Sequence, residues 1–186
     1  MLRLRGGDDC TGRAQSNCVP YVRDDRYSRS MAQQRRAGSD SRCCTRQDPP
    51  LIWRDYVDDL HPSVVAMDRW LDGLVPFERF HQEGENAELM EAAAAGELWD
   101  SGDETARIKP IYSDPDVYEL RRRALTKALR FYHAEPVELP TALVSLHRHI
   151  KSDSPSQQSE IDFAVERYRA GAGNGWQPRS SPPNNL

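Results

Sequence analysis

The side chains with most chemical potential lie on three runs of the second half of the sequence, residues 117–123, 128–134 and 142–150. Each run alternates polar and apolar residues, as a β-strand does when one of its faces is buried. The apolar faces carry residues such as Leu120 and Leu129, and we place Val144, Leu146 and Ile150 with them. The polar faces together collect cations and rings: Arg121, Arg123, Arg130, Lys151, Tyr132, His147 and His149.

This set of side chains is suited to cleaving RNA. Arginine binds phosphate oxygens through its planar fork, and a tyrosine ring stacks on a base. A histidine with a pKa near its ordinary value of about 6.5 gives or takes a proton at neutral pH. Cleavage requires a base for the 2′-hydroxyl, a cation for the charged phosphorane and an acid for the departing 5′-oxygen. All three kinds of group are present.

Two simpler interpretations remain open for the same residues. The open face of an antiparallel sheet is polar in many proteins, and charges on neighbouring strands pair there without any catalytic role. The i, i+2 spacing of His147 and His149 would also suit a metal, but no third ligand is obvious. We therefore expect neither a metal nor a cofactor.

The elements that must position this face follow from the spacing of apolar residues. Residues 51–57 form a short apolar stretch, interpreted as an edge strand. A helical hairpin follows, with one helix after Pro62 and a second over residues 86–95 that ends at Gly96. The strand runs come next, with residues 107–112 continuing into the first of them, and a last helix begins near Pro155 and ends at Gly171. This order predicts an α+β fold in which an N-terminal helical hairpin packs on a three- to four-stranded antiparallel sheet, with a C-terminal helix.

Composition divides the chain into a domain and two tails. Residues 1–50 contain ten arginines but no Phe or Trp, so they are expected to be a disordered arginine-rich tail. The domain is expected over residues 51–172, with a second disordered tail over 173–186. All four cysteines lie in the first tail with no zinc-binding spacing, which suits a reducing cytosol. No signal peptide or membrane span is visible, so a cytoplasmic protein without a membrane partner is expected.

Charge is distributed as unevenly as the apolar residues. The chain has a formal net charge of −4, but residues 107–151 carry nine Arg or Lys against five acids. Residues 55–106 carry two Arg against fourteen acids. A basic segment beside an acidic one favours a polyanion site on the strand segment, although two solvated faces of opposite sign would show the same pattern.

Four short motifs, in this order, resemble the RelE/HigB toxins of bacterial type II toxin–antitoxin systems, and their phage-derived branch in particular. The motifs are Tyr118-Glu119-Leu120-Arg121, Arg130-Phe131-Tyr132, Leu146-His147-Arg148-His149-Ile150-Lys151 and Glu160-Ile161-Asp162-Phe163-Ala164. The resemblance implies a RelE/ParE-like fold and a cytoplasmic endoribonuclease. It also implies cleavage of messenger RNA, usually on the ribosome, and silencing by a helix-turn-helix antitoxin.

The resemblance also implies roles for single residues. Arg130 matches the arginine at the scissile phosphate, Arg121 the strand arginine, Lys151 the lysine that closes the last strand, and His147 the strand histidine. We expect these four to be catalytic, and Tyr132, His149 and Arg123 to bind RNA.

Two further functions stay open. A ParE-like gyrase inhibitor would share the fold but would need no proton-transfer groups, so the histidines favour the nuclease. A degenerate toxin would act only as an antitoxin-binding partner. A single Lys151 before Ser152, where the family has two lysines, favours that function.

Overall fold

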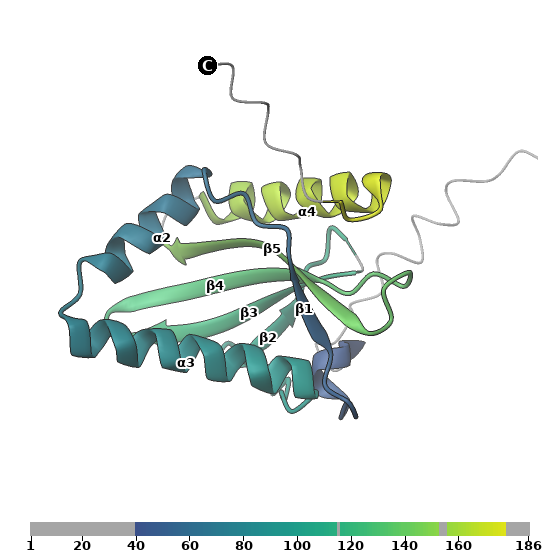
Figure 1. Ribbon diagram of the computed structural model, residues 1–186, viewed down its shortest axis with the longest axis horizontal. Helices are drawn as coiled ribbons and strands as arrows, with labels where there is room; N and C mark the ends of the chain where they lie inside the picture. Colours follow the sequence, from purple (N-terminus) through teal and green to yellow (C-terminus); the bar gives the residue numbers. More distant parts are fainter. Residues whose placement is uncertain (1–39, 115, 153–155, 178–186) are drawn as a thin grey trace, which may run out of the picture.

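A computed structural model describes residues 40–114, 116–152 and 156–177 of the chain. It is an α+β fold in which three α-helices pack around one mixed five-stranded sheet (Figure 1). The elements in chain order are the 3₁₀-helix η2 (Arg42–Cys44), β1 (Ile52–Asp55), α2 (Pro62–Asp72), α3 (Pro76–Ala95), β2 (Ile108–Pro110), β3 (Val117–Ala124), β4 (Lys127–Ala134), β5 (Ala142–Lys151) and α4 (Ser156–Asn174). None of the helices in these ranges is both long and apolar enough to span a membrane.

The prediction of a purely antiparallel sheet of three or four strands is wrong. The strand order is β1-β5-β4-β3-β2, and β1 runs parallel to β5 with Ile52 opposite Ala142. The remaining neighbours are antiparallel. The predicted edge strand at residues 51–57 does form, as β1. Two helices separate it in sequence from the other strands, and the alternation of residues within a strand does not show which strand it pairs with. Residues 107–112, predicted to continue into the run 117–123, instead contain a separate strand, β2, which pairs antiparallel with β3.

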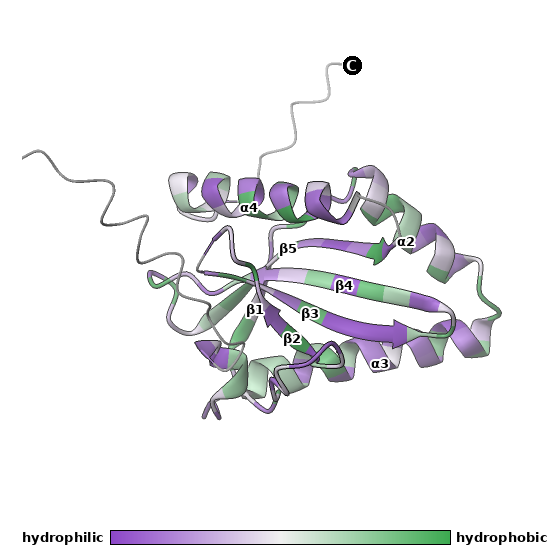
Figure 2. Cartoon of the chain, turned by 180° about the vertical axis from the view of Figure 1, so that it is seen from behind, coloured by the Kyte–Doolittle hydropathy of each residue, from purple (hydrophilic) through white to green (hydrophobic). Residues whose placement is uncertain are grey.

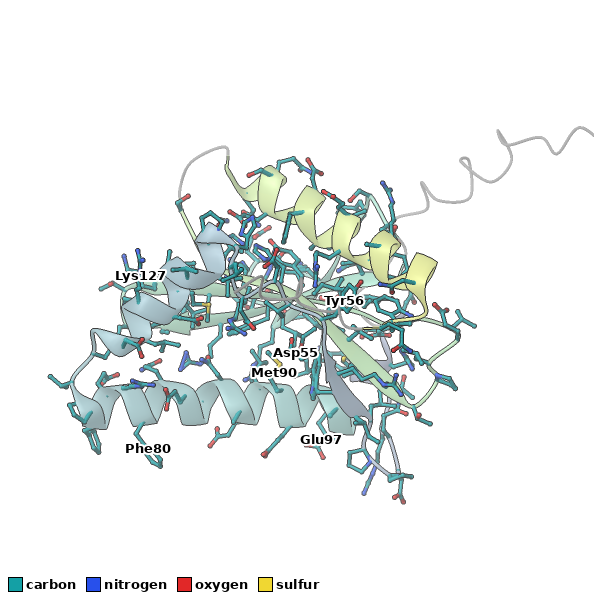
Figure 3. All side chains as sticks on the ribbon, turned by 45° about the horizontal axis from the view of Figure 1, so that its top comes forward. Asp55, Tyr56, Phe80, Met90, Glu97 and Lys127 are labelled. Carbon is teal, nitrogen blue, oxygen red and sulfur yellow. The ribbon has the colours of Figure 1, made fainter. Side chains whose placement is uncertain are left out.

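Helices α2 and α3 cover one face of the sheet. Met67 of α2 and Leu89 and Ala93 of α3 are buried in one core with Leu120 and Leu129 of the central strands. Figure 3 shows Met90 on the side of α3 toward the sheet and Phe80 on the opposite side. Helix α3 begins ten residues before the predicted start at residue 86. Its first half escaped prediction because Phe77 and Phe80 are exposed and form no apolar stripe toward the sheet.

Helix α4 covers part of the opposite face and makes a second core there. Ala164 and Val165 of α4 pack with Tyr132, Val144 and Leu146. Val144 and Leu146 were expected on the other face, with the apolar residues of β3 and β4. The pairing of β4 with β5 shifts register between Tyr132 and His133, and this irregularity places Leu146 on the same side as the histidines.

Residues 40–50 pack against the domain, although they were predicted to belong to the arginine-rich tail. Ser41 and Cys43 are buried, and Cys43 joins the core beneath α3. The backbone amide of Gln47 donates a hydrogen bond to the carbonyl of Ala95 at 2.9 Å. Composition did not predict this packing, because it uses backbone groups, cysteines and polar side chains such as Ser41 and Arg42 rather than large apolar side chains. The arginine-rich residues 1–39 lie outside the described residues, as does the predicted helix start at Pro155.

Gly96 allows α3 to end against this segment. Its φ is +73°, and a Cβ built on it would lie 1.8 Å from the backbone oxygen of Thr45. Gly96→Ala should therefore cost about 2 kcal/mol or more, since it adds a backbone clash to the strain of a left-handed alanine. Gly84→Ala is the control: Gly84 lies within α3, a Cβ there meets nothing within 4 Å, and alanine should gain about 0.5–1 kcal/mol. Urea denaturation measures both, and equal effects of the two variants would contradict the close approach.

Candidate functional site: a basic pocket beside buried rings

A pocket of about 430 Å³ lies over the ends of β3, β4 and β5. Five of its lining residues are cations and one is an acid: Arg121, Arg122, Arg123, Arg130, Lys151 and Glu104. Figure 2 shows the hydrophilic second half of β3 beside β4 in this region. The structure thus brings together four of the seven predicted site residues, the cations Arg121, Arg123, Arg130 and Lys151. A pocket of this charge and size can take a phosphate group together with part of a nucleotide.

Glu119 neutralises part of this charge. Its carboxylate lies 2.5 Å from Nε of Arg130 and 3.2 Å from Nε of Arg121. The register explains the contact, since Glu119 lies opposite Tyr132 and Arg121 lies opposite Arg130, all on one side of the sheet. Burial lowers the pKa of Arg130, and the charge of Glu119 opposes that shift. One carboxylate therefore serves two guanidinium groups and leaves the pocket with a net positive charge.

The three rings predicted for this face, Tyr132, His147 and His149, are buried rather than open to solvent. They are 1%, 1% and 3% exposed, because α4 packs over them. The rings are nearly parallel, with interplanar angles of 10–12° and centroids 5.7–6.0 Å apart. The Tyr132 hydroxyl and His149 Nε2 are hydrogen-bonded at 3.2 Å. The rings are thus next to the basic pocket, through the cross-strand pair Arg130–His149, but do not line it.

Burial fixes the protonation of these rings. It lowers the pKa of His149 to about 4 and also lowers the pKa of His147, in each case against the opposing charge of Glu160. Burial also raises the pKa of Tyr132. At pH 7 both imidazoles are therefore neutral and the phenol keeps its proton. A neutral imidazole is a proton acceptor, so His149 has the state that a general base needs.

A hydrogen-bonded group from α2 and α4 holds His147. Its Nε2 lies 2.5 Å from Oε2 of Glu160, and Oε1 of the same carboxylate accepts a hydrogen bond from the Ser63 hydroxyl at 2.6 Å. Burial alone would raise the pKa of Glu160, but the hydrogen bonds from Ser63 and His147 lower it. The ring of His61 contacts His147 edge-on at 4.8 Å. His147 is therefore fixed in orientation and removed from solvent.

Sequence analysis missed Glu119, Glu160 and His61 as members of this site. Glu119 and Arg121 are two residues apart on one strand, so the pair was visible in the alternation. The other two lie 13 and 86 residues from His147 in the sequence, and no local pattern connects them to it.

Two groups in the described residues have ligand-type atoms close enough to share a metal ion. They are His61, His147 and Glu160 on the α4 face and Cys43, His133 and Glu135 on the α3 face. The first supplies the third ligand that was not obvious beside His147. However, its 2.5 Å distance between nitrogen and oxygen is that of a short hydrogen bond, whereas two ligands of one tetrahedral zinc lie about 3.3 Å apart. The ligand atoms of the second group, Cys43, His133 and Glu135, lie farther apart than those of His147 and Glu160.

No protein-family model, no curated protein and no solved structure matches the chain. Fold and site therefore define the class only as an α+β protein with a basic pocket on its sheet. The resemblance to RelE/HigB toxins stays a prediction from the four short motifs.

The depressed histidine pKa values predict a loss of stability in mild acid. The unfolded chain takes up protons near pH 6.5, whereas folded His149 does so only near pH 4, so stability should fall as the pH drops below about 6.5. Each unit of depression is worth about 1.4 kcal/mol at most. In His149→Gln the free energy of unfolding should depend less on pH between pH 6.5 and 4.5 than it does in wild type.

Denaturation at a series of pH values measures this effect. His81→Gln is the control, because His81 is exposed on α3, and that variant should keep the wild-type slope. An unchanged slope in His149→Gln would show that His149 is not the group responsible.

Proposed function

We propose that the chain is an endoribonuclease, the toxin of a type II toxin–antitoxin system, and that it binds RNA phosphate in the basic pocket. The single observation that supports this function most strongly is the convergence of Arg121, Arg123, Arg130 and Lys151 on one pocket of about 430 Å³. The four motifs shared with RelE/HigB toxins add to it. Arginine supplies two parallel donors to phosphate oxygens, which suits both ground-state binding and the charged phosphorane.

In the proposed reaction the 2′-oxygen of RNA attacks the phosphorus and the bond from phosphorus to the 5′-oxygen breaks. His149, the cross-strand partner of Arg130, accepts the 2′-hydroxyl proton, since its imidazole is neutral. Arg130 and Arg121 stabilise the charge on the phosphorane, and the ammonium of Lys151 gives a proton to the 5′-oxygen. The products are a 2′,3′-cyclic phosphate and a 5′-hydroxyl.

The other two rings have supporting roles in this proposal. His147, predicted to be catalytic, is bonded to Glu160 beneath α4 and is assigned to holding the ring of His149. Tyr132 bonds the same ring through its hydroxyl and would stack on a base only once it is uncovered. Because His149 is only 3% exposed, the reaction requires α4 to move away from β5 when RNA binds.

The partners follow from the same proposal. The RNA is messenger RNA bound on the ribosome, and the protein acts in the cytoplasm without a membrane partner. A helix-turn-helix antitoxin would silence it by placing an acidic or helical segment over the basic pocket, where charge complementarity is greatest.

A non-catalytic function is the second candidate, and the burial of His147 and His149 favours it. A protein that binds through the cations alone has no need of accessible proton-transfer groups. Such a protein would be a ParE-like gyrase inhibitor or a degenerate toxin that only binds its antitoxin.

An assay with end-labelled single-stranded RNA separates these functions. Wild type should produce fragments that end in a cyclic phosphate, and a 2′-O-methyl group at the cleaved position should prevent the cut. Arg130→Ala should lower the cleavage rate by about 10²–10³, and Arg130→Lys should restore only part, because an ammonium cannot reproduce the fork. A thermal melt of each variant shows whether the fold survives.

Binding is measured separately, from its dependence on salt. Arg123→Ala and Lys151→Ala should each weaken RNA binding and reduce the salt slope by about 0.7. Lys127→Ala is the matched control, because Lys127 is an exposed cation of β4 outside the pocket (Figure 3). Binding without cleavage would support the non-catalytic function, whereas equal effects of Lys127→Ala and Lys151→Ala would contradict the pocket itself.

A further inference from the structure

We propose that Cys43, His133 and Glu135 form a structural zinc site on the α3 face of the sheet. The three atoms that would bind the metal point at one another: Cys43 Sγ lies 3.4 Å from His133 Nε2 and 3.5 Å from Glu135 Oε1, and the last two atoms are 3.1 Å apart. This site is separate from the basic pocket and shares no residue with it.

The distances agree with those of ligands around one tetrahedral ion. Zinc–sulfur bonds of about 2.3 Å and zinc–nitrogen or zinc–oxygen bonds of about 2.0–2.1 Å place the sulfur about 3.5 Å from the other ligands and those about 3.3 Å from each other. A metal at this point would reach all three atoms with small side-chain shifts. Thiolate, imidazole and carboxylate together favour zinc among the common divalent ions.

The surroundings orient two of the three ligands. The backbone amide of Arg42 donates to Glu135 Oε2 at 2.8 Å, which leaves Oε1 directed at the cluster. The ring of His133 is stacked on Tyr118 at 5.7 Å and contacts Trp53 edge-on at 5.6 Å. Such outer contacts fix ligand orientation at metal sites.

Burial indicates a structural role and argues against a catalytic one. Cys43 is 0% exposed and His133 1% exposed, so the thiol cannot reach a substrate as a nucleophile. A water would complete the four-coordinate shell, because the hydroxyl of Ser41 donates a hydrogen bond to Glu135 Oε1. It is the burial of the group, which leaves no position open to a substrate, that assigns it a structural role.

The site would join segments far apart in the sequence. Cys43 lies in η2, whereas His133 and Glu135 lie at the end of β4, about 90 residues later. Residues 40–50 contribute few large apolar side chains, so hydrophobic burial holds this segment only weakly against the sheet. A metal bound by Cys43, His133 and Glu135 would hold it there. Because the unfolded chain has no such site, the free energy of metal binding would add to the free energy of folding.

The competing explanation is a buried hydrogen-bonded triad. In that arrangement His133 donates to Glu135 and the thiol donates weakly, since S–H is a poor donor. In both arrangements Nδ1 of His133 has no hydrogen-bond partner among the described residues. The ring lines a cavity of about 190 Å³, which has room for a water that could bond it. The triad and the metal site predict different results for metal content.

The experiment measures metal in the full-length protein, without RNA. Purified wild type should carry one zinc per chain by elemental analysis, and cobalt(II) added to the metal-free protein should give a thiolate charge-transfer band. Removing zinc with a chelator should lower the melting temperature, and adding ZnCl₂ should restore it. These readings need no variant, so they remain decisive even if substitutions in the core prevent folding.

Variants then identify the ligands. Cys43→Ala should abolish the charge-transfer band, and His133→Ala should lower zinc affinity by more than about 100-fold, the upper loss seen for outer-shell changes. Cys44→Ala, next in sequence but outside the cluster, should keep one zinc per chain. Wild type that takes up no zinc or cobalt, or a Cys43→Ala variant that keeps full affinity, would overturn the site and leave the hydrogen-bonded triad.

Discussion

A largely buried arginine on a strand needs a carboxylate beside it, and Glu119 is that carboxylate for Arg130. The cost of moving a guanidinium from water into the interior is several kcal/mol, and an opposite charge in contact is what offsets it. The 2.5 Å contact between the two groups therefore allows β4 to carry a cation at a position that is only 9% exposed. Because Arg121 contacts the same carboxylate, the pair keeps an excess of positive charge, and that excess makes the pocket attractive to an anion.

The same burial that stabilises this face also restricts what it can do. Rings held parallel under α4 are well ordered, and order is what a catalytic group requires. Yet exclusion from water lowers the pKa values of His147 and His149 and separates them from any substrate in the pocket. Binding and proton transfer are therefore supported by different parts of the face. The cations that line the pocket support binding, whereas proton transfer depends on rings that are uncovered only if α4 moves. This division is why the nuclease and the binding function must be distinguished by separate measurements.

Local patterns predicted the strands well, since β4 and β5 were expected over residues 128–134 and 142–150 and occupy Lys127–Ala134 and Ala142–Lys151. Alternation also placed Arg121, Arg130, Tyr132 and His147 on one side of the sheet, as the pairing confirms. It could not predict that α4 would cover that side, because coverage depends on tertiary packing. It also could not predict the register shift after Tyr132 or the parallel pairing of β1. Both depend on how two strands pair, and the alternation within a single strand does not contain that information.

The register shift lies between the two candidate sites and connects them physically. Tyr132 and His133 are neighbours in β4, yet Tyr132 packs with His149 under α4 while His133 points to Cys43 and Glu135 under α3. The extra residue at the shift is Leu146 of β5, because Tyr132 pairs with His147 and His133 with Ser145, whereas Tyr132 and His133 follow each other in β4 and point to opposite faces. Fixing His133 on one face would therefore restrict how far Tyr132, and with it the ring of His149, can move on the other. A structural metal bound by His133 would therefore act on β4, the strand that carries Arg130, without contacting any residue of the basic pocket.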